Sequence, residues 1–310
     1  MESLRQILSP DFLLRNSVYT SVLIGFACPL VGMFLVLRRL VFMGVALPQI
    51  SSTGIAIAFS VPMWLGLLQP EHAARGEHLC AFVGSTVFSL AAILVMAFLE
   101  RHGRGSLEGR LGTAYVVAAA LSIILLSKNR YGEVGWLDLM KGEVITIDNF
   151  DLALTGITLA LVLTVLGLFH KEILLVSFDR AMAVTLGKNI VFWDIVLYLL
   201  IGLTVSMAVL SVGPLIAFGF LLIPALTSHQ FARTMRQFTI TAAIIGGFSS
   251  FVGFWIAYEY NLPVGPTDVV LLGVVYCFGI LAQRLRTAIS ASRQTRARSG
   301  GIAQPPQAPT

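Results

Sequence analysis

Long apolar stretches without charge are the feature that most restricts how this 310-residue chain can fold. A helix that crosses a bilayer needs about 20 mostly apolar residues, at a rise of about 1.5 Å per residue. Charged residues make up only 12% of the chain, about half of what a soluble domain carries. The uncharged stretches follow one another at 16–37, 40–70, 79–99, 111–127, 152–169, 195–232, 237–258 and 269–283. They exclude a soluble enzyme and predict a polytopic membrane protein.

The stretch at 195–232 is too long for one crossing, and Gly213-Pro214 lies near its middle. Both residues interrupt helical hydrogen bonding, so we expect two helices joined by a tight turn. The prediction is therefore an all-α fold with about nine transmembrane helices in one membrane domain, 1–284. Residues 285–310 are rich in Arg, Ser, Gln and Pro and are predicted to form a disordered, basic cytoplasmic tail.

The basic residues predict the orientation of the chain, because loops rich in Lys and Arg stay in the cytoplasm. Nine crossings place the termini on opposite sides. With the C-terminus inside, 15 of the 21 Lys and Arg residues fall on the cytoplasmic side and six on the outer side. We therefore predict an outer N-terminus and a cytoplasmic C-terminus. The formal charge of +5 is a topology signal and does not indicate a nucleic-acid partner.

The energy source for any active transport is expected to lie in another subunit. In this assignment no carboxylate or base remains at mid-membrane depth, where ion-driven transporters and intramembrane proteases usually need one. A phosphate-binding GxxxxGK[ST] loop is also missing, since Gly187-Lys188-Asn189 lacks both the upstream glycine and the hydroxyl residue. The chain is therefore not expected to be an enzyme, and ATP would be hydrolysed by a partner.

The second apolar stretch carries a proline and a row of small polar residues. Gln49, Ser52 and Thr53 follow Pro48, whose ring frees a backbone carbonyl one turn earlier. Two interpretations stay open. The small residues pack helices closely, or the polar face lines a substrate pathway.

A second informative segment lies between the fifth and sixth crossings on the predicted inner side. Ser177 or Asp179 is placed to cap a short helix, and Gly187 to end it. Such a helix suits docking into a cytoplasmic partner, and the alternative is an ordinary amphipathic connector. Further along, small residues recur at helical spacing and predict close helix packing: Ala242, Gly246, Ser249 and Gly253.

Together, four motifs resemble those of the permease subunits of ATP-binding-cassette importers for zinc, manganese and iron, from Phe12 to Gln283. The family's arginines, followed by G-D-x-L-x-H and a glycine, match Arg38, Arg39, Gly44, Leu47 and Gly54. Its F-D-x-x-x-A-x-x-x-G segment matches Phe178, Asp179, Ala183 and Gly187. Its V-G-x-L and L-x-I-P-A elements match Val212, Gly213, Leu215, Leu221, Ile223, Pro224 and Ala225. Its S-Y-x-x-D-L-P-x-G ending matches Tyr258, Leu262, Pro263 and Gly265.

The resemblance implies a permease in a bacterial-type inner membrane that works by alternating access. It implies a permease homodimer or a pair with a close paralogue, a cytoplasmic ATP-binding subunit and an extracytoplasmic solute-binding protein. The substrate would be a divalent transition metal (zinc, manganese or iron), with no cofactor bound permanently. Phe178, Asp179, Arg180, Ala183 and Gly187 would form the segment that couples to the ATPase.

The sequence departs from the family at the pathway. Val45 and Gln49 replace the family's Asp and His, which are thought to hold the metal in transit, and Asn261 replaces a usual Asp. Zinc and manganese prefer imidazole, carboxylate or thiolate ligands. The candidate pathway residues Val45, Gln49, Ser52 and Thr53 include none of these. The open alternatives are a plain polar conduit, an importer of a metal chelate or cobalamin-like solute, and a non-transporting scaffold of the same fold.

Overall fold

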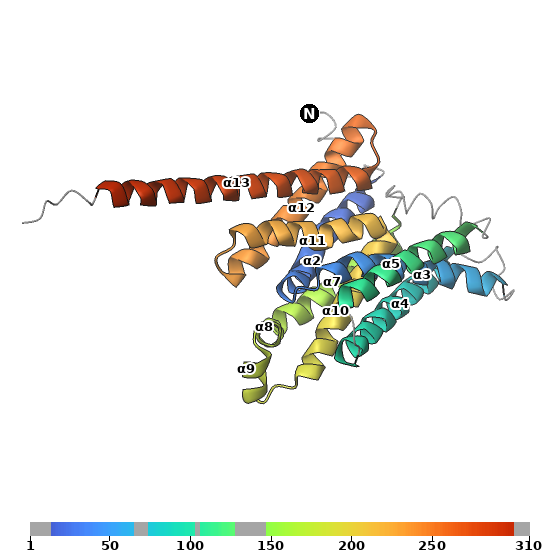
Figure 1. The fold of residues 1–310 in the computed structure, drawn as a ribbon. Helices are drawn as coiled ribbons and strands as arrows, with labels where there is room; N and C mark the ends of the chain where they lie inside the picture. The colour runs from blue at the N-terminus through green and yellow to red at the C-terminus, as the bar shows by residue number, and fades with distance from the viewer. Residues whose placement is uncertain (1–13, 65–73, 103–105, 128–146, 301–310) are drawn as a thin grey trace, which may run out of the picture.

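The computed structural model describes residues 14–64, 74–102, 106–127 and 147–300, and within them it contains helices and no strand (Figure 1). Nine of the helices are long, and two short ones, α8 and α9, connect α7 to α10. The helices are α2 (Arg15–Leu37), α3 (Val41–Trp64), α4 (Ala74–His102), α5 (Leu107–Ser127), α7 (Asn149–Leu168), α8 (His170–Phe178), α9 (Arg180–Thr185), α10 (Ile190–Val212), α11 (Pro214–Phe231), α12 (Met235–Tyr260) and α13 (Val264–Gly300).

The long helices match the predicted crossings. Eight of them are long and apolar enough to cross a membrane, and α4 contributes a shorter apolar part, Cys80–Val95, among its described residues. The turn inside 195–232 is also found where it was predicted. Gly213 has a φ of 86°, and Pro214 opens α11, where its missing N–H costs no hydrogen bond. The all-helical fold with about nine crossings is therefore confirmed.

Helix α2 lies inside the bundle and packs against α7, α10, α11 and α12. It approaches α12 closely, since a Cβ on Gly246 would overlap the carbonyl oxygen of Gly25. One turn away, the hydroxyl oxygens of Ser21 and Ser250 lie 2.8 Å apart. The predicted close packing of small residues is confirmed, because the four at helical spacing in α12 are all buried: Ala242, Gly246, Ser249 and Gly253.

The outer helices have a different surface. Only 22% of the apolar window is buried in each of α5, α7 and α13, against 61–67% in α2, α3, α10 and α11. Their outward side chains are apolar, as in Val116, Ile157, Leu161 and Val270. Apolar side chains suit a lipid environment, and the backbone polar groups are satisfied within each helix. The fold therefore has a tightly packed centre inside an apolar rim.

Two carboxylates lie deeper than the sequence predicts. Asp194 and Asp268 directly precede the uncharged stretches 195–232 and 269–283 in the sequence, but in the structure they lie within α10 and α13 and are buried. Each is four residues from the start of its helix, about 6 Å along the axis. Both oxygens of Asp268 lack a hydrogen-bond partner within the described part of the chain. Both carboxylates lie near a helix end, so they do not contradict the prediction that no carboxylate or base lies at mid-membrane depth.

The end of the chain also differs from prediction. The last crossing was placed at 269–283, but α13 begins at Val264 and continues to Gly300, past its neighbours (Figure 1). Pro266 fits the first turn of a helix, and the Arg, Ala and Gln residues after Leu285 favour helix formation. The predicted boundary at 284/285 is therefore not a helix end. The rest of the predicted disordered tail, 301–310, lies outside the described residues.

Candidate functional site

Three of the predicted pathway residues share one face of α3. At about 100° per residue, Val45, Gln49 and Ser52 lie within roughly 60° of one another on the helix, and we call these three the α3 stripe. Val45 and Gln49 are partly exposed, whereas Ser52 is fully buried and its hydroxyl has no hydrogen-bond partner within the described residues. A buried orphan hydroxyl calls for an explanation in a native structure.

Thr53 lies at the edge of this face. Its hydroxyl is 2.8 Å from the carbonyl oxygen of Ala118 in α5 and 3.1 Å from that of Gln49. A hydroxyl has one hydrogen to donate, so these two carbonyls share it or compete for it. The structure therefore places Thr53 in the contact between α3 and α5.

The neighbours of α3 define where the stripe lies. A Cβ on Gly44 would contact Leu222 of α11, and a Cβ on Gly54 would contact the backbone of Gly84 in α4. Thr53 faces α5. On the helical wheel, Val45 and Gln49 fall between the α11 side and the α5 side. This sector is the side of α3 on which the two residues remain partly exposed.

The α3 stripe offers little to a bare metal ion. Its polar groups are the Gln49 amide and the Ser52 hydroxyl, whereas zinc and manganese prefer imidazole, carboxylate or thiolate ligands. Among the described residues, no group of three or more His, Cys, Asp or Glu side chains is placed to hold a metal. The stripe can give a solute hydrogen bonds but no charge.

The connector between α7 and α10 contains the predicted short helix. Asp179 caps α9, since its Oδ1 accepts a hydrogen bond from the backbone N–H of Met182 at 2.9 Å. Gly187 follows the helix end with a φ of 69°, and the N–H of Lys188 bonds to the carbonyl of Ala183 at 3.0 Å. This pair of features is a Schellman end. The predicted cap and end at Asp179 and Gly187 are confirmed.

Apolar side chains project from this connector into open space. Phe178, Met182, Val184 and Leu186 are each more than half exposed, whereas Ala183 is fully buried. The connector therefore presents an apolar surface within nine residues. Arg180, the remaining predicted coupling residue, is also exposed and lies on the same short helix.

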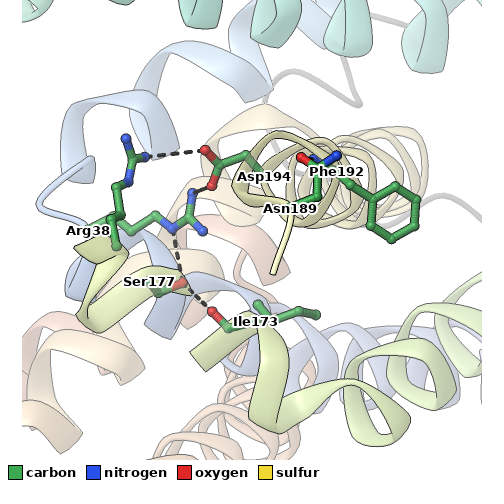
Figure 2. A network of polar contacts seen from close by, with 7 residues as sticks. Arg38, Ile173, Ser177, Asn189, Phe192 and Asp194 are labelled. Carbon is green, nitrogen blue, oxygen red and sulfur yellow. Dashed lines mark hydrogen bonds and ion pairs between the residues drawn. The ribbon is translucent and has the colours of Figure 1, made fainter. Parts of the chain in front are cut away.

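A polar network joins this connector to two crossing helices (Figure 2). Arg38, at the end of α2, lies with its Nη1 2.7 Å from Oδ1 of Asp194 in α10. Its Nε donates to the hydroxyl of Ser177 in α8 at 3.0 Å. Arg180 of α9 reaches the other oxygen of Asp194 at 3.4 Å. We call Arg38, Ser177, Arg180 and Asp194 the junction network.

The sequence motifs identified Arg38 and Arg180 but not their shared partner. Asp194 is 156 residues from Arg38 in sequence, and no local pattern reports such a contact. A weaker signal was present, because Asp194 is a lone carboxylate between Trp193 and Ile195 at the edge of an apolar run. An acid in that position usually has a cationic partner.

Comparison with known proteins places the fold and motifs in a family. The model of the ABC 3 transport family matches residues 11–283. The manganese transport system membrane protein MntC of Listeria monocytogenes is 26% identical over 268 residues, covering 86% of this chain and 90% of that protein. The manganese import system permease protein ScaB of Streptococcus gordonii is 24% identical, with 85% and 88% covered.

A solved structure supports the fold independently. The chain is similar to a chain in the structure of PsaBC from Streptococcus pneumoniae in complex with Fab, with a TM-score of 0.76 at 23% identity. The match covers 90% of this chain and 94% of that one. The family match over almost the whole helical bundle agrees with the four sequence motifs, so the chain belongs to the ABC 3 transport family.

Proposed function

We propose that this chain is the membrane-spanning permease subunit of an ABC importer that moves a divalent transition metal into the cell. The observation that carries the proposal is the family match over residues 11–283. Relatives that cover most of the chain are named as manganese transport or import proteins. Manganese is therefore the first metal to test, ahead of zinc and iron.

The partners follow from the same proposal. A separate cytoplasmic ATPase subunit hydrolyses ATP and docks on the α8–α9 connector, whose apolar side chains Phe178, Met182, Val184 and Leu186 are exposed. This docking places the connector and the C-terminus in the cytoplasm, as the basic residues predict. Two permeases pair around a central route, and an extracytoplasmic solute-binding protein delivers the cargo. Alternating access then exposes the route first to one side and then to the other.

The route runs along the α3 stripe in this proposal. Val45 and Gln49 are partly exposed between α5 and α11, and the orphan hydroxyl of Ser52 lies on the same face. Since the stripe holds no imidazole, carboxylate or thiolate, the solute-binding protein selects the metal and the permease supplies a polar conduit. Thr53 supports this wall from the α5 side through its bond to Ala118.

A second candidate substrate is a metal chelate. The observation that favours it is the missing ligand pair at Val45 and Gln49, because a chelated metal brings its own ligands and needs only hydrogen bonds and space from the protein. In this case the subunit and its partners are the same, and only the cargo differs.

The test measures the cellular content of manganese, zinc, iron and other elements in a strain that lacks this gene, with and without the gene restored. Deletion is expected to lower cellular manganese when the free ion is supplied, and restoration should recover it. Recovery only when the metal is supplied as a chelate would favour the second candidate. No change in any element, with or without chelators, would contradict transport and favour a membrane scaffold.

A further inference from the structure

The Asp194 carboxylate is shared by arginines from two different parts of the chain. Its Oδ1 pairs with Arg38 at the end of α2, and its Oδ2 pairs with Arg180 of α9. Ser177 of α8 bonds to Arg38 as well, so four helices meet at one buried acid (Figure 2). A contact of this kind fixes the relative positions of the helices that supply the charges.

The two arginine contacts differ in strength. The side chains of Arg38 and Asp194 are each 6% exposed and 2.7 Å apart, whereas Arg180 is 57% exposed and 3.4 Å away. Arg38 is further fixed by Ser177 and lies 5.8 Å from the ring centroid of Tyr198. Breaking a buried pair leaves an uncompensated charge, while an exposed contact breaks at little cost. Arg38 and Asp194 therefore form the fixed part of the network, and Arg180 forms its adjustable part.

The buried pair of Arg38 and Asp194 lies near the start of α3, the helix that carries the α3 stripe. Arg38 is the residue that follows the last turn of α2 as its C-cap, Arg39 adopts a left-handed φ of 59°, and α3 begins at Val41. Val45 and Gln49 follow within the first three turns of α3. A displacement of Arg38 thus acts at the start of α3, through a turn of only three residues.

We infer that Asp194 is a positioning residue that transmits movement of α9 to the turn between α2 and α3. When the ATPase displaces α9, the exposed contact between Arg180 and Asp194 breaks or forms at little cost. The charge that Asp194 directs at its buried partner Arg38 changes with it, and this acts on the turn before α3. The inference rests on the proposed function, because it assumes that an ATPase docks on the α8–α9 connector.

The test compares Arg180→Gln with a matched control on the same connector. Lys188 and Glu172 form an ion pair at 3.8 Å, with both side chains partly exposed, so Lys188→Gln removes one positive charge without touching Asp194. Each variant is assembled with the ATPase subunit in nanodiscs and trapped with ADP and vanadate. Amide hydrogen exchange is then followed at Arg39 and Leu40, whose N–H groups bond to Val36 and Leu35 across the turn.

In the parent complex, trapping is expected to change the exchange of these two amides. Arg180→Gln should shrink that change by up to about fivefold, which corresponds to the upper end of about 1 kcal/mol for an exposed charge contact. Lys188→Gln should match the parent, and Arg180→Lys, which keeps the charge, should recover most of the change. The exchange of α9 itself should respond to trapping in all four complexes.

Three results would overturn the inference: no response at the turn in the parent, an undiminished response in Arg180→Gln, or an equal loss in Lys188→Gln. Failure of the proposed function has a different signature. In that case the ATPase does not co-purify with the parent chain, and the inference fails with it.

Discussion

The junction network and the α3 stripe lie at neighbouring levels of the same helix pair and differ in charge. At the junction, three charged side chains converge on a mostly buried site. A few residues further along α3, the stripe has Val45 and Gln49 where the family has Asp and His. In the proposed permease, the junction network is the part that moves helices, and the α3 stripe is the part where ion selection would differ from that of the family.

Physical cost explains why the two regions must be judged differently. Removing one partner of a buried ion pair costs several kcal/mol of stability, so single substitutions in the junction network should destabilise the fold. The α3 stripe carries no charge, so its side chains have little free-energy cost in a membrane, and neutral substitutions there should be tolerated more readily. The first region is therefore expected to respond strongly to single changes, and the second to respond mainly when charge is introduced.

The largest expected effect is the presence or absence of reporter activity. It tests whether the junction network faces the cytoplasm or the outer side of the membrane. A reporter that is active only in the cytoplasm, fused after Thr310, should be active because basic loops stay inside. A fusion at the same position to a reporter active only outside the cytoplasm should be silent. The reverse pattern would place the connector outside and remove it from any ATPase.

Next in size is the effect of removing the shared carboxylate. Asp194→Ala leaves Arg38 buried without its partner, so we expect a loss of stability on the order of 3 kcal/mol. Denaturant titration of the purified protein in detergent measures it. Glu172→Ala is the control, because its pair with Lys188 is partly exposed and should contribute less than about 1 kcal/mol. Equal losses in the two variants would contradict the distinction between them.

Charge introduced into the α3 stripe should have a slightly smaller effect on insertion. Val45→Asp places a carboxylate four residues from the start of α3, so its cost should be below the roughly 3 kcal/mol that insertion scales give for the helix centre. Adding Gln49→His one turn away supplies a partner, so the double variant should insert better than Val45→Asp alone. Membrane abundance and metal bound to the purified protein are the measurements. A double variant that inserts normally but neither binds metal nor changes transport would show that these positions do not face the route.

The local features of the fold were predictable, because local residues determine them. The crossings follow from uncharged length, the turn at Gly213 from two helix-breaking residues, and the ends of α9 from Asp179 and Gly187. What remained unpredicted depends on residues far apart in sequence or on weak preferences. Asp194 is recognised only once α2 and α10 are packed together, and the extension of α13 to Gly300 follows from modest helix propensity.

The candidate site likewise has features that the sequence predicts and features that depend on how the helices pack. The motif positions of the α3 stripe were readable in the sequence, but the contact of Thr53 with Ala118 depends on how α5 packs against α3. Asn261 illustrates the same limit, since it ends α12 in the left-handed conformation that Asn tolerates. This placement gives the substitution for the family's Asp a structural role in the turn to α13.

The most direct test compares the two regions in one assay. The permease is reconstituted with its ATPase and solute-binding protein, and ATP-dependent uptake of manganese is measured for the parent, for Gln49→Ala, and for Asp179→Lys with Arg180→Asp. The account predicts that Gln49→Ala retains uptake within about fivefold, since one neutral hydrogen bond is worth about 1 kcal/mol or less. The charge reversal should abolish uptake while membrane abundance stays normal. Normal uptake in the reversed variant, together with loss of uptake in Gln49→Ala, would contradict the account.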